Sequence, residues 1–126
     1  MCSSDLIPCF GTTHADYFHG EIPITAQLSR QEIESEYEAN TGAAIIARMK
    51  GIAPLGCPAC LVSGHAPFCW GESVSEAVHM AAIVEEIAAM AWQTVTINPA
   101  ARPISEALRD KHHFRKHGPT ATYGQK

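Results

Sequence analysis

A basic excess is missing from this sequence of 126 residues. Nine Lys and Arg residues stand against thirteen Asp and Glu residues, which leaves a formal net charge of −4. Because no global positive field attracts nucleic acid or an anionic membrane surface, we expect neither as a partner. Hydrophobic residues make up 46% of the chain, which excludes disorder and collagen-like repeats and suffices for a core in one domain or part of one.

A membrane-spanning segment and a signal peptide are not evident either. The longest stretch without charge, Gly51–Gly71, contains three prolines and four glycines, and a helix so interrupted could not span a bilayer. The first residues lack the charged, apolar and small-residue regions of a signal peptide. We therefore expect a soluble, cytoplasmic protein.

The cysteines do not form an obvious disulfide or metal pattern, because there are five of them, scattered along the chain. Cys57 and Cys60 make a C-x-x-C pair, but a zinc ribbon needs a second pair. A thioredoxin-like motif lies between a strand and a helix, whereas an apolar strand is predicted here after the pair. We interpret both as small buried or half-buried thiols in a reducing compartment.

The first six residues differ from the rest of the chain, since Met1–Leu6 has no periodic pattern and an apolar segment follows it abruptly. A GTG start followed by TGC TCT TCC GAT CT encodes this peptide, and that string resembles the end of a common sequencing adapter. We expect residues 1–6 to be a non-native scar. Residues 7–126 would then be the carboxy-terminal portion of one longer domain.

Short strands alternate with longer helices in the predicted secondary structure. Strands are predicted at 7–10, 21–25 and 59–63. Helices are predicted at 29–51, 73–95 and 103–117. Capping boxes support two helix starts, Ser29 with Glu32 and Ser73 with Glu76. The longest helix has its apolar face at Ala77, Ala81, Val84, Ala88 and Trp92. This order indicates an α/β layered fold.

Two segments carry residues suited to chemistry, and each has a structural alternative. Residues 11–17 place hydroxyls, an imidazole and the Asp16 carboxylate just after a strand, where functional loops are common. The alternative is an Asx-type turn in which Asp16 holds local backbone amides. His65 follows a buried strand, but a catalytic zinc needs three ligands and the chain has no H-x-H or H-E-x-x-H pair, so on pattern alone a structural histidine is favoured.

The last predicted helix is rich in cations and histidines over 109–117. Cations near a helix carboxyl end complement its dipole and need no ligand. Their density also fits a phosphate or a neighbouring acidic subunit.

Six motifs together resemble the L-ribulose-5-phosphate 4-epimerase group of the class II aldolase and adducin-like family. They are G-T-T-H-A-D-Y-F at 11–18, G-E-I-P-I-T at 20–25, E-Y-E-A-N-T-G at 36–42, H-A-P-F-C-W-G at 65–71, D-K-H-H-F-R-K-H-G at 110–118 and Y-G-Q at 123–125. The resemblance covers residues 7–125 and only the carboxy-terminal half of the family domain. It implies a three-layer α/β/α sandwich with a largely antiparallel central sheet, truncated at the amino terminus.

The resemblance also implies roles for individual residues. Asp16 is expected to be a catalytic acid/base residue, and Tyr123 its counterpart supplied by an adjacent subunit. His65 is expected to be one of three zinc-binding histidines, the other two belonging to an upstream His-x-His motif that this chain does not contain. Three further positions are expected near the active site, namely Thr12, Glu38 and His112.

The implied function is zinc-dependent 4-epimerisation of L-ribulose 5-phosphate to D-xylulose 5-phosphate by retro-aldol and aldol steps. The implied partners are a pentulose phosphate and further copies of the chain in a homotetramer with shared active sites. One alternative is a class II sugar-phosphate aldolase of the same fold. Another is an inactive fragment or an adducin-like interaction module, which the missing zinc motif favours.

Overall fold

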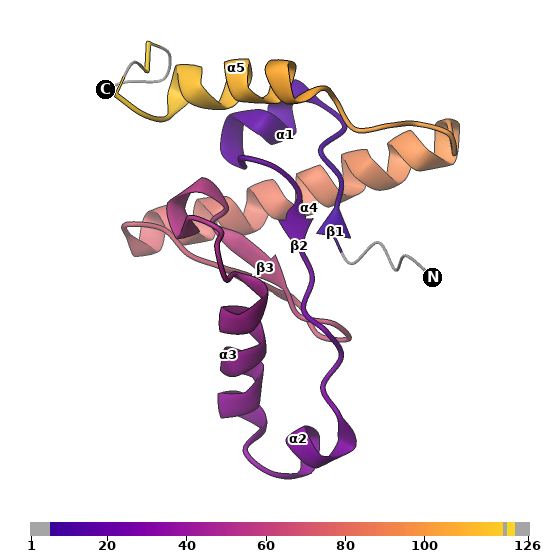
Figure 1. The fold of residues 1–126 in the computed structure, drawn as a ribbon, viewed down its shortest axis with the longest axis vertical. Coiled ribbons are helices and arrows are strands. Elements are labelled where there is room, and N and C mark those ends of the chain that lie inside the picture. Colours follow the sequence, from indigo (N-terminus) through magenta and orange to yellow (C-terminus); the bar gives the residue numbers. More distant parts are fainter. Residues whose placement is uncertain (1–5, 120, 123–126) are drawn as a thin grey trace.

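The structure is a computed structural model that describes residues 6–119 and 121–122 (Figure 1). Its helices are α1 (Thr12–Tyr17), α2 (Arg30–Glu34), α3 (Tyr37–Arg48), α4 (Val74–Ile97) and α5 (Glu106–Lys116), with a short 3₁₀ helix at Pro54–Gly56. Its strands are β1 (Leu6–Ile7), β2 (Ile22–Pro23), β3 (Ala59–Leu61) and β4 (Pro67–Cys69).

The strands form two small antiparallel sheets. Ile7 of β1 pairs with Ile22 of β2, and Cys60 of β3 pairs with Phe68 of β4. A single parallel bridge between Ile24 and Leu61 joins the two sheets. The mixture of helices and antiparallel strands agrees with the predicted α/β class, whereas the three-layer sandwich around one central sheet stays a prediction.

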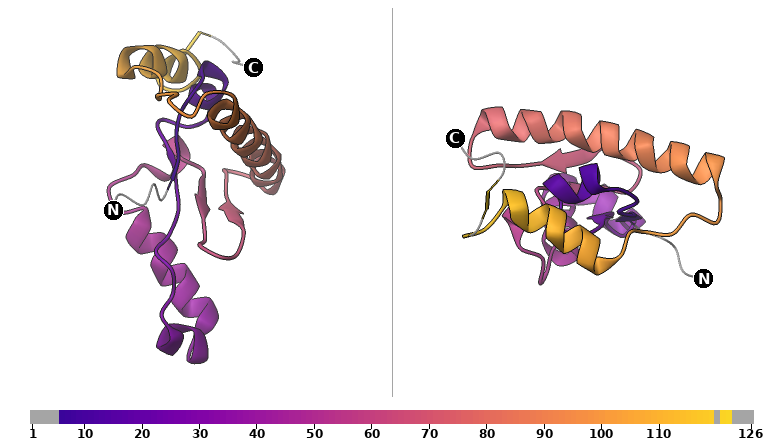
Figure 2. Two further views of the ribbon diagram at one scale, coloured as in Figure 1. Left: turned by 90° about the vertical axis from the view of Figure 1, so that its right-hand side faces the viewer. Right: turned by 90° about the horizontal axis from the view of Figure 1, so that it is seen from above.

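The core lies where α1, the strands and the inner face of α4 meet. Seen from above, α1 lies between α4 and α5 (Figure 2). The buried core residues are Ile7, Phe18, Ile22, Cys57, Ala59, Met80, Val84 and Ile87. Full burial of a large apolar side chain contributes about 1.5–3 kcal/mol, so this group holds the strands against α4.

The apolar face of α4 is only partly the predicted one. Val84 is buried as expected, but Trp92 is 67% exposed. Met80 and Ile87 lie at i−4 and i+3 from Val84 and define the buried stripe with it. Ala77, Ala81 and Ala88 are half-buried, so the predicted face is wrong only at Trp92, near the end of the helix.

The helix predicted from Ser29 to Gly51 is divided into α2 and α3. The capping box at its start is confirmed, with the Glu32 amide donating to Ser29 Oγ and the Ser29 amide donating to Glu32 Oε2. The division lies at Ser35, where the backbone leaves the helical region. There, Asn40 Nδ2 donates to the Glu32 carbonyl, which α2 leaves unsatisfied at its end. Figures 1 and 2 show that α2 and α3 extend away from the other elements.

The other helix boundaries are close to those predicted. Ser73 caps α4 through the Glu76 amide, and Ser105, two residues after the expected start, caps α5 through the Leu108 amide. Gly118 follows α5 with φ of 102°, a conformation that favours glycine at a helix end.

The outer face of α4 is apolar and exposed, with Val74, Val78, Trp92 and Ile97 all open to solvent. By length and composition alone, α4 could cross a membrane. A single such helix is weak evidence, because core helices of soluble proteins have the same length and composition.

Candidate functional site

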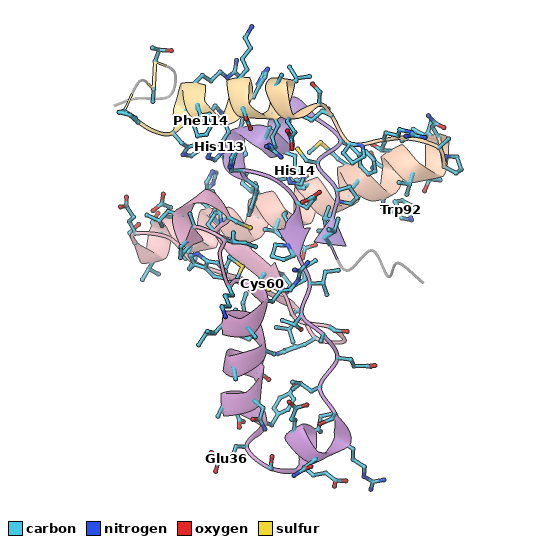
Figure 3. The ribbon with its side chains drawn as sticks, in the orientation of Figure 1. His14, Glu36, Cys60, Trp92, His113 and Phe114 are labelled. Atoms are coloured by element: carbon cyan, nitrogen blue, oxygen red, sulfur yellow. The ribbon has the colours of Figure 1, made fainter. Side chains whose placement is uncertain are left out.

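The segment 11–17 forms a short helix that depends on α5. α1 has six residues and no side-chain cap at its amino end. A helix this short is not stable alone, because its terminal carbonyls have no partners within the helix. α5 supplies two partners, since His113 Nδ1 donates to the Ala15 carbonyl at 3.2 Å and His117 Nε2 donates to the Asp16 carbonyl at 2.8 Å. Figure 3 shows His113 between the two helices.

The carboxylate of Asp16 is surrounded by hydrogen-bond donors and cations of α5. His112 Nδ1 donates to Oδ1 at 3.2 Å, and Arg115 Nη2 contacts both oxygens at 3.2 and 3.1 Å. Lys116 Nζ lies 3.4 Å from Oδ2. Asp16 is 9% exposed, so these interactions are largely shielded from water. The Asx-type turn is therefore wrong, because the carboxylate binds a distant helix and not the local backbone amides.

The charges of α5 decide the ionisation of Asp16. Burial would raise the pKa of this carboxyl group. The hydrogen bonds from Arg115 and His112 and the charge of Lys116 outweigh burial, so the pKa is lowered from its ordinary value. Asp16 is therefore an ionised proton acceptor at neutral pH.

Histidine rings pack together where α5 contacts the end of α1. The rings of His113 and His117 stack at 4.5 Å between centroids, and His19 lies 4.7 Å from His113. Burial and then the nearby His117 lower the pKa of His113 to about 4. His113 is therefore neutral, and its Nδ1 proton is fixed by the carbonyl that accepts it. His19 Nε2 makes a separate, more exposed contact with Asp110 Oδ1 at 2.9 Å.

The structure brings together three of the expected site residues. Asp16 and His112 are 96 residues apart in sequence and in direct contact. Thr12 begins α1, one helical turn before Asp16, and is half-buried. The sequence analysis did not assign a role to four further residues of this contact, Arg115, Lys116, His113 and His117. The signal available in the sequence was the density of cations and histidines over 109–117.

The remaining expected residues lie elsewhere. Glu38 is exposed in the first turn of α3, next to the Glu36 labelled in Figure 3, far from α1 and α5. His65 is exposed in the turn between β3 and β4, where its ring packs edge-on against Phe68 at 5.8 Å. In Figures 1 and 2 this turn lies well away from α1. Tyr123 lies outside the described residues.

The described part of the chain does not contain a complete metal site. Among residues 6–119 and 121–122, no group of three His, Cys, Asp or Glu side chains could hold a metal ion. Cys57 and Cys60 are free and buried, as predicted for the C-x-x-C pair. A cavity of about 160 Å³ lies beside the site, between Tyr17 and His117. A larger and more open cavity of about 510 Å³ lies along His113, Lys116 and His117, within the range of about 300–1,000 Å³ that is usual for small-molecule sites.

Comparison with known proteins identifies the family. Residues 1–92 match the family described as Class II Aldolase and Adducin N-terminal domain, so the chain belongs to the class II aldolase and adducin family. It is 52% identical over 120 residues to L-ribulose-5-phosphate 4-epimerase UlaF of Salmonella paratyphi B, covering 95% of this chain and 53% of that protein. The same values hold for UlaF of Salmonella choleraesuis and of Salmonella typhi. The resemblance predicted from the motifs is confirmed, and the chain spans about half the length of these curated relatives.

Proposed function

We propose that this chain is part of a cytoplasmic, zinc-dependent enzyme of pentose catabolism that converts L-ribulose 5-phosphate into D-xylulose 5-phosphate. The observation that carries the proposal is the 52% identity to relatives whose names state the 4-epimerase activity. The contact between Asp16 and His112 supports it, because two residues implied by the resemblance meet across 96 positions of sequence.

The substrate chemistry explains why an acid/base pair is needed. In a 2-ketose phosphate the hydrogen on C4 is not alpha to the carbonyl, so its direct removal is very unfavourable. The C4 hydroxyl is beta to the carbonyl, and its deprotonation allows the C3–C4 bond to break into a three-carbon enediolate and glycolaldehyde phosphate. Rotation of the aldehyde and re-formation of the bond on its other face give the epimer and return the proton. This sequence needs one proton-transferring group on each face.

Asp16 is suited to one of these faces. Its carboxylate is ionised, shielded from water and fixed by α5, so it can accept a hydroxyl proton and return it. Tyr123 is proposed for the other face on the resemblance alone.

Zinc is proposed on the resemblance and on family membership, which suggests a divalent metal. Of the expected ligands the described chain supplies only His65, so the described residues do not fit a zinc site by themselves. We therefore assign no step to the metal. The other ligands would have to come from the portion of the relatives that this chain does not match.

We further propose that the active site is shared between copies in a homo-oligomer, with a homotetramer as the expected assembly. In one chain, His65 lies on an exposed turn away from the contact of α1 with α5. A second copy could bring the two groups together, as the resemblance implies for Tyr123.

The test uses a chimera in which this chain replaces the stretch of the Salmonella UlaF protein that it matches. The chimera should convert L-ribulose 5-phosphate into D-xylulose 5-phosphate, and Asp16→Asn should lower turnover by about 100- to 10,000-fold. Asp110→Asn, on the same helix but away from Asp16, is the matched control and should change turnover little. Released glycolaldehyde phosphate in place of epimer would instead support the aldolase alternative, and a folded, inactive chimera would contradict the proposal.

A further inference from the structure

Both oxygens of Asp16 are contacted by side chains of α5. Oδ1 accepts hydrogen bonds from both His112 and Arg115. Oδ2 accepts one hydrogen bond from Arg115, and its second neighbour, Lys116 Nζ, lies at 3.4 Å. Each carboxylate oxygen therefore has two neighbouring donor groups, and all of them come from α5.

The backbone of Asp16 is held as firmly as its side chain. The carbonyl of Asp16 accepts from Nε2 of His117, the residue that follows α5, at 2.8 Å. His113 holds the preceding carbonyl, that of Ala15. Positions 113 and 117 are one helical turn apart, so the two imidazoles follow each other along one face of α5. The residue is thus fixed at its backbone and at its carboxylate by the same helix.

On this basis, and given the proposed epimerase function, we propose that Arg115 and His117 are positioning residues for Asp16. Arg115 contacts both carboxylate oxygens, while His117 holds the backbone carbonyl of the same residue. Arg115 contacts the carboxylate of Asp16 and His117 contacts its backbone, and neither is assigned a proton transfer. They act by presenting Asp16 in a single orientation.

The choice of arginine is explained by its geometry. A guanidinium group can reach two carboxylate oxygens from one rigid plane, whereas an ammonium group is a compact point charge. Both contacts come from one nitrogen, Nη2, so Lys at position 115 would retain the charge and lose the planar group that directs this nitrogen. Gln would lose the charge as well. Comparing Arg, Lys and Gln at position 115 therefore separates the effect of the positive charge on Asp16 from the effect of orienting its carboxylate.

A second ion-paired contact in the same region provides the control. Arg109 Nη2 lies 2.9 Å from Asp110 Oδ1, which also accepts from His19. These groups connect α5 with the residues that follow α1. The side chain of Asp110 is considerably more exposed than that of Asp16 and is not among the groups that contact the Asp16 carboxylate. Arg109→Gln therefore removes a guanidinium from the same helix without touching Asp16.

The first measurement needs no enzymatic activity. The Asp16 carboxyl carbon is titrated by ¹³C NMR in the 126-residue chain with Arg115→Gln, Arg115→Lys and Arg109→Gln. We expect Arg115→Gln to raise the pKa of Asp16, Arg115→Lys to raise it less, and Arg109→Gln to leave it unchanged. Amide exchange of α5 shows that each variant remains folded, and Arg115→Lys keeps the test decisive if Arg115→Gln unfolds. An unchanged Asp16 titration in folded variants overturns the proposal.

The second measurement uses the active chimera. Arg115→Gln should lower kcat on the order of 100-fold with little change in KM, and should move the acid limb of the pH profile to higher pH. His117→Ala should lower kcat, and His117→Gln, which retains an N–H donor, should restore part of it. If substitutions at Arg115 and at His117 both leave kcat unchanged, the proposal that these residues position Asp16 is refuted. A chimera without epimerase activity refutes the proposed function, and the Asp16 titration still decides whether Arg115 controls its carboxylate.

Discussion

Acidification should destabilise the chain through His113, and the effect has a calculable size. The pKa of His113 is about 4, against an ordinary 6.5, because the ring is buried and lies against His117. The unfolded chain therefore binds a proton at a pH where the folded chain does not. Stability from the neutral ring is fully present above about pH 6.5 and falls as the pH is lowered toward 4. At about 1.4 kcal/mol per pH unit, the loss between pH 6.5 and 5 is about 2 kcal/mol.

The assay is urea denaturation followed by circular dichroism at pH 6.5 and pH 5. The wild type should lose about 2 kcal/mol more than His113→Gln between these conditions, because glutamine can donate a hydrogen bond and does not titrate. His14, whose pKa is lowered by burial, adds an acid loss in this range that both proteins share, whereas the loss from Asp16 falls at lower pH. His65→Gln, at an exposed position, is the control and should keep the wild-type loss. If wild type and His113→Gln lose the same free energy of unfolding, protonation of His113 does not destabilise the folded chain and the prediction is refuted.

The remaining predictions concern the metal, the shared site and the core. The purified chain alone should bind zinc poorly, and tight stoichiometric zinc that disappears in His65→Ala, measured by metal analysis, would contradict this. Full-length Tyr123→Phe and Asp16→Asn subunits, each inactive, should recover part of the activity when reassembled together; no recovery in mixed oligomers verified by mass would place both groups in one subunit. Ile87→Ala should cost about 2–5 kcal/mol in denaturant unfolding because it leaves a cavity, whereas exposed Trp92→Ala should cost less than about 1 kcal/mol.

Features with a local cause could be predicted from the sequence. The caps at Ser29 and Ser73 and the glycine after α5 depend on a few neighbouring residues, and the structure places them as expected. The break at Ser35 could not be predicted, because Asn40 satisfies the end of α2 from the next helix.

The candidate site depends on contacts that no local pattern contains. α1 looked like a loop or a turn because its helical state is maintained by His113 and His117, about a hundred residues away. The family motifs nevertheless named Asp16 and His112, which the fold brings together. They did not indicate that Arg115 would hold both oxygens of the carboxylate.

The dependence of α1 on α5 also sets an order of events during synthesis. Residue 16 leaves the ribosome 96 residues before residue 112, the first of its partners. At about 5–20 residues per second, this separation corresponds to roughly 5–20 s of elongation. During that interval the carbonyls of Ala15 and Asp16 lack the histidines that later cap them. The helix around Asp16 therefore lacks these partners in the nascent chain and gains them only when the last helix has been made.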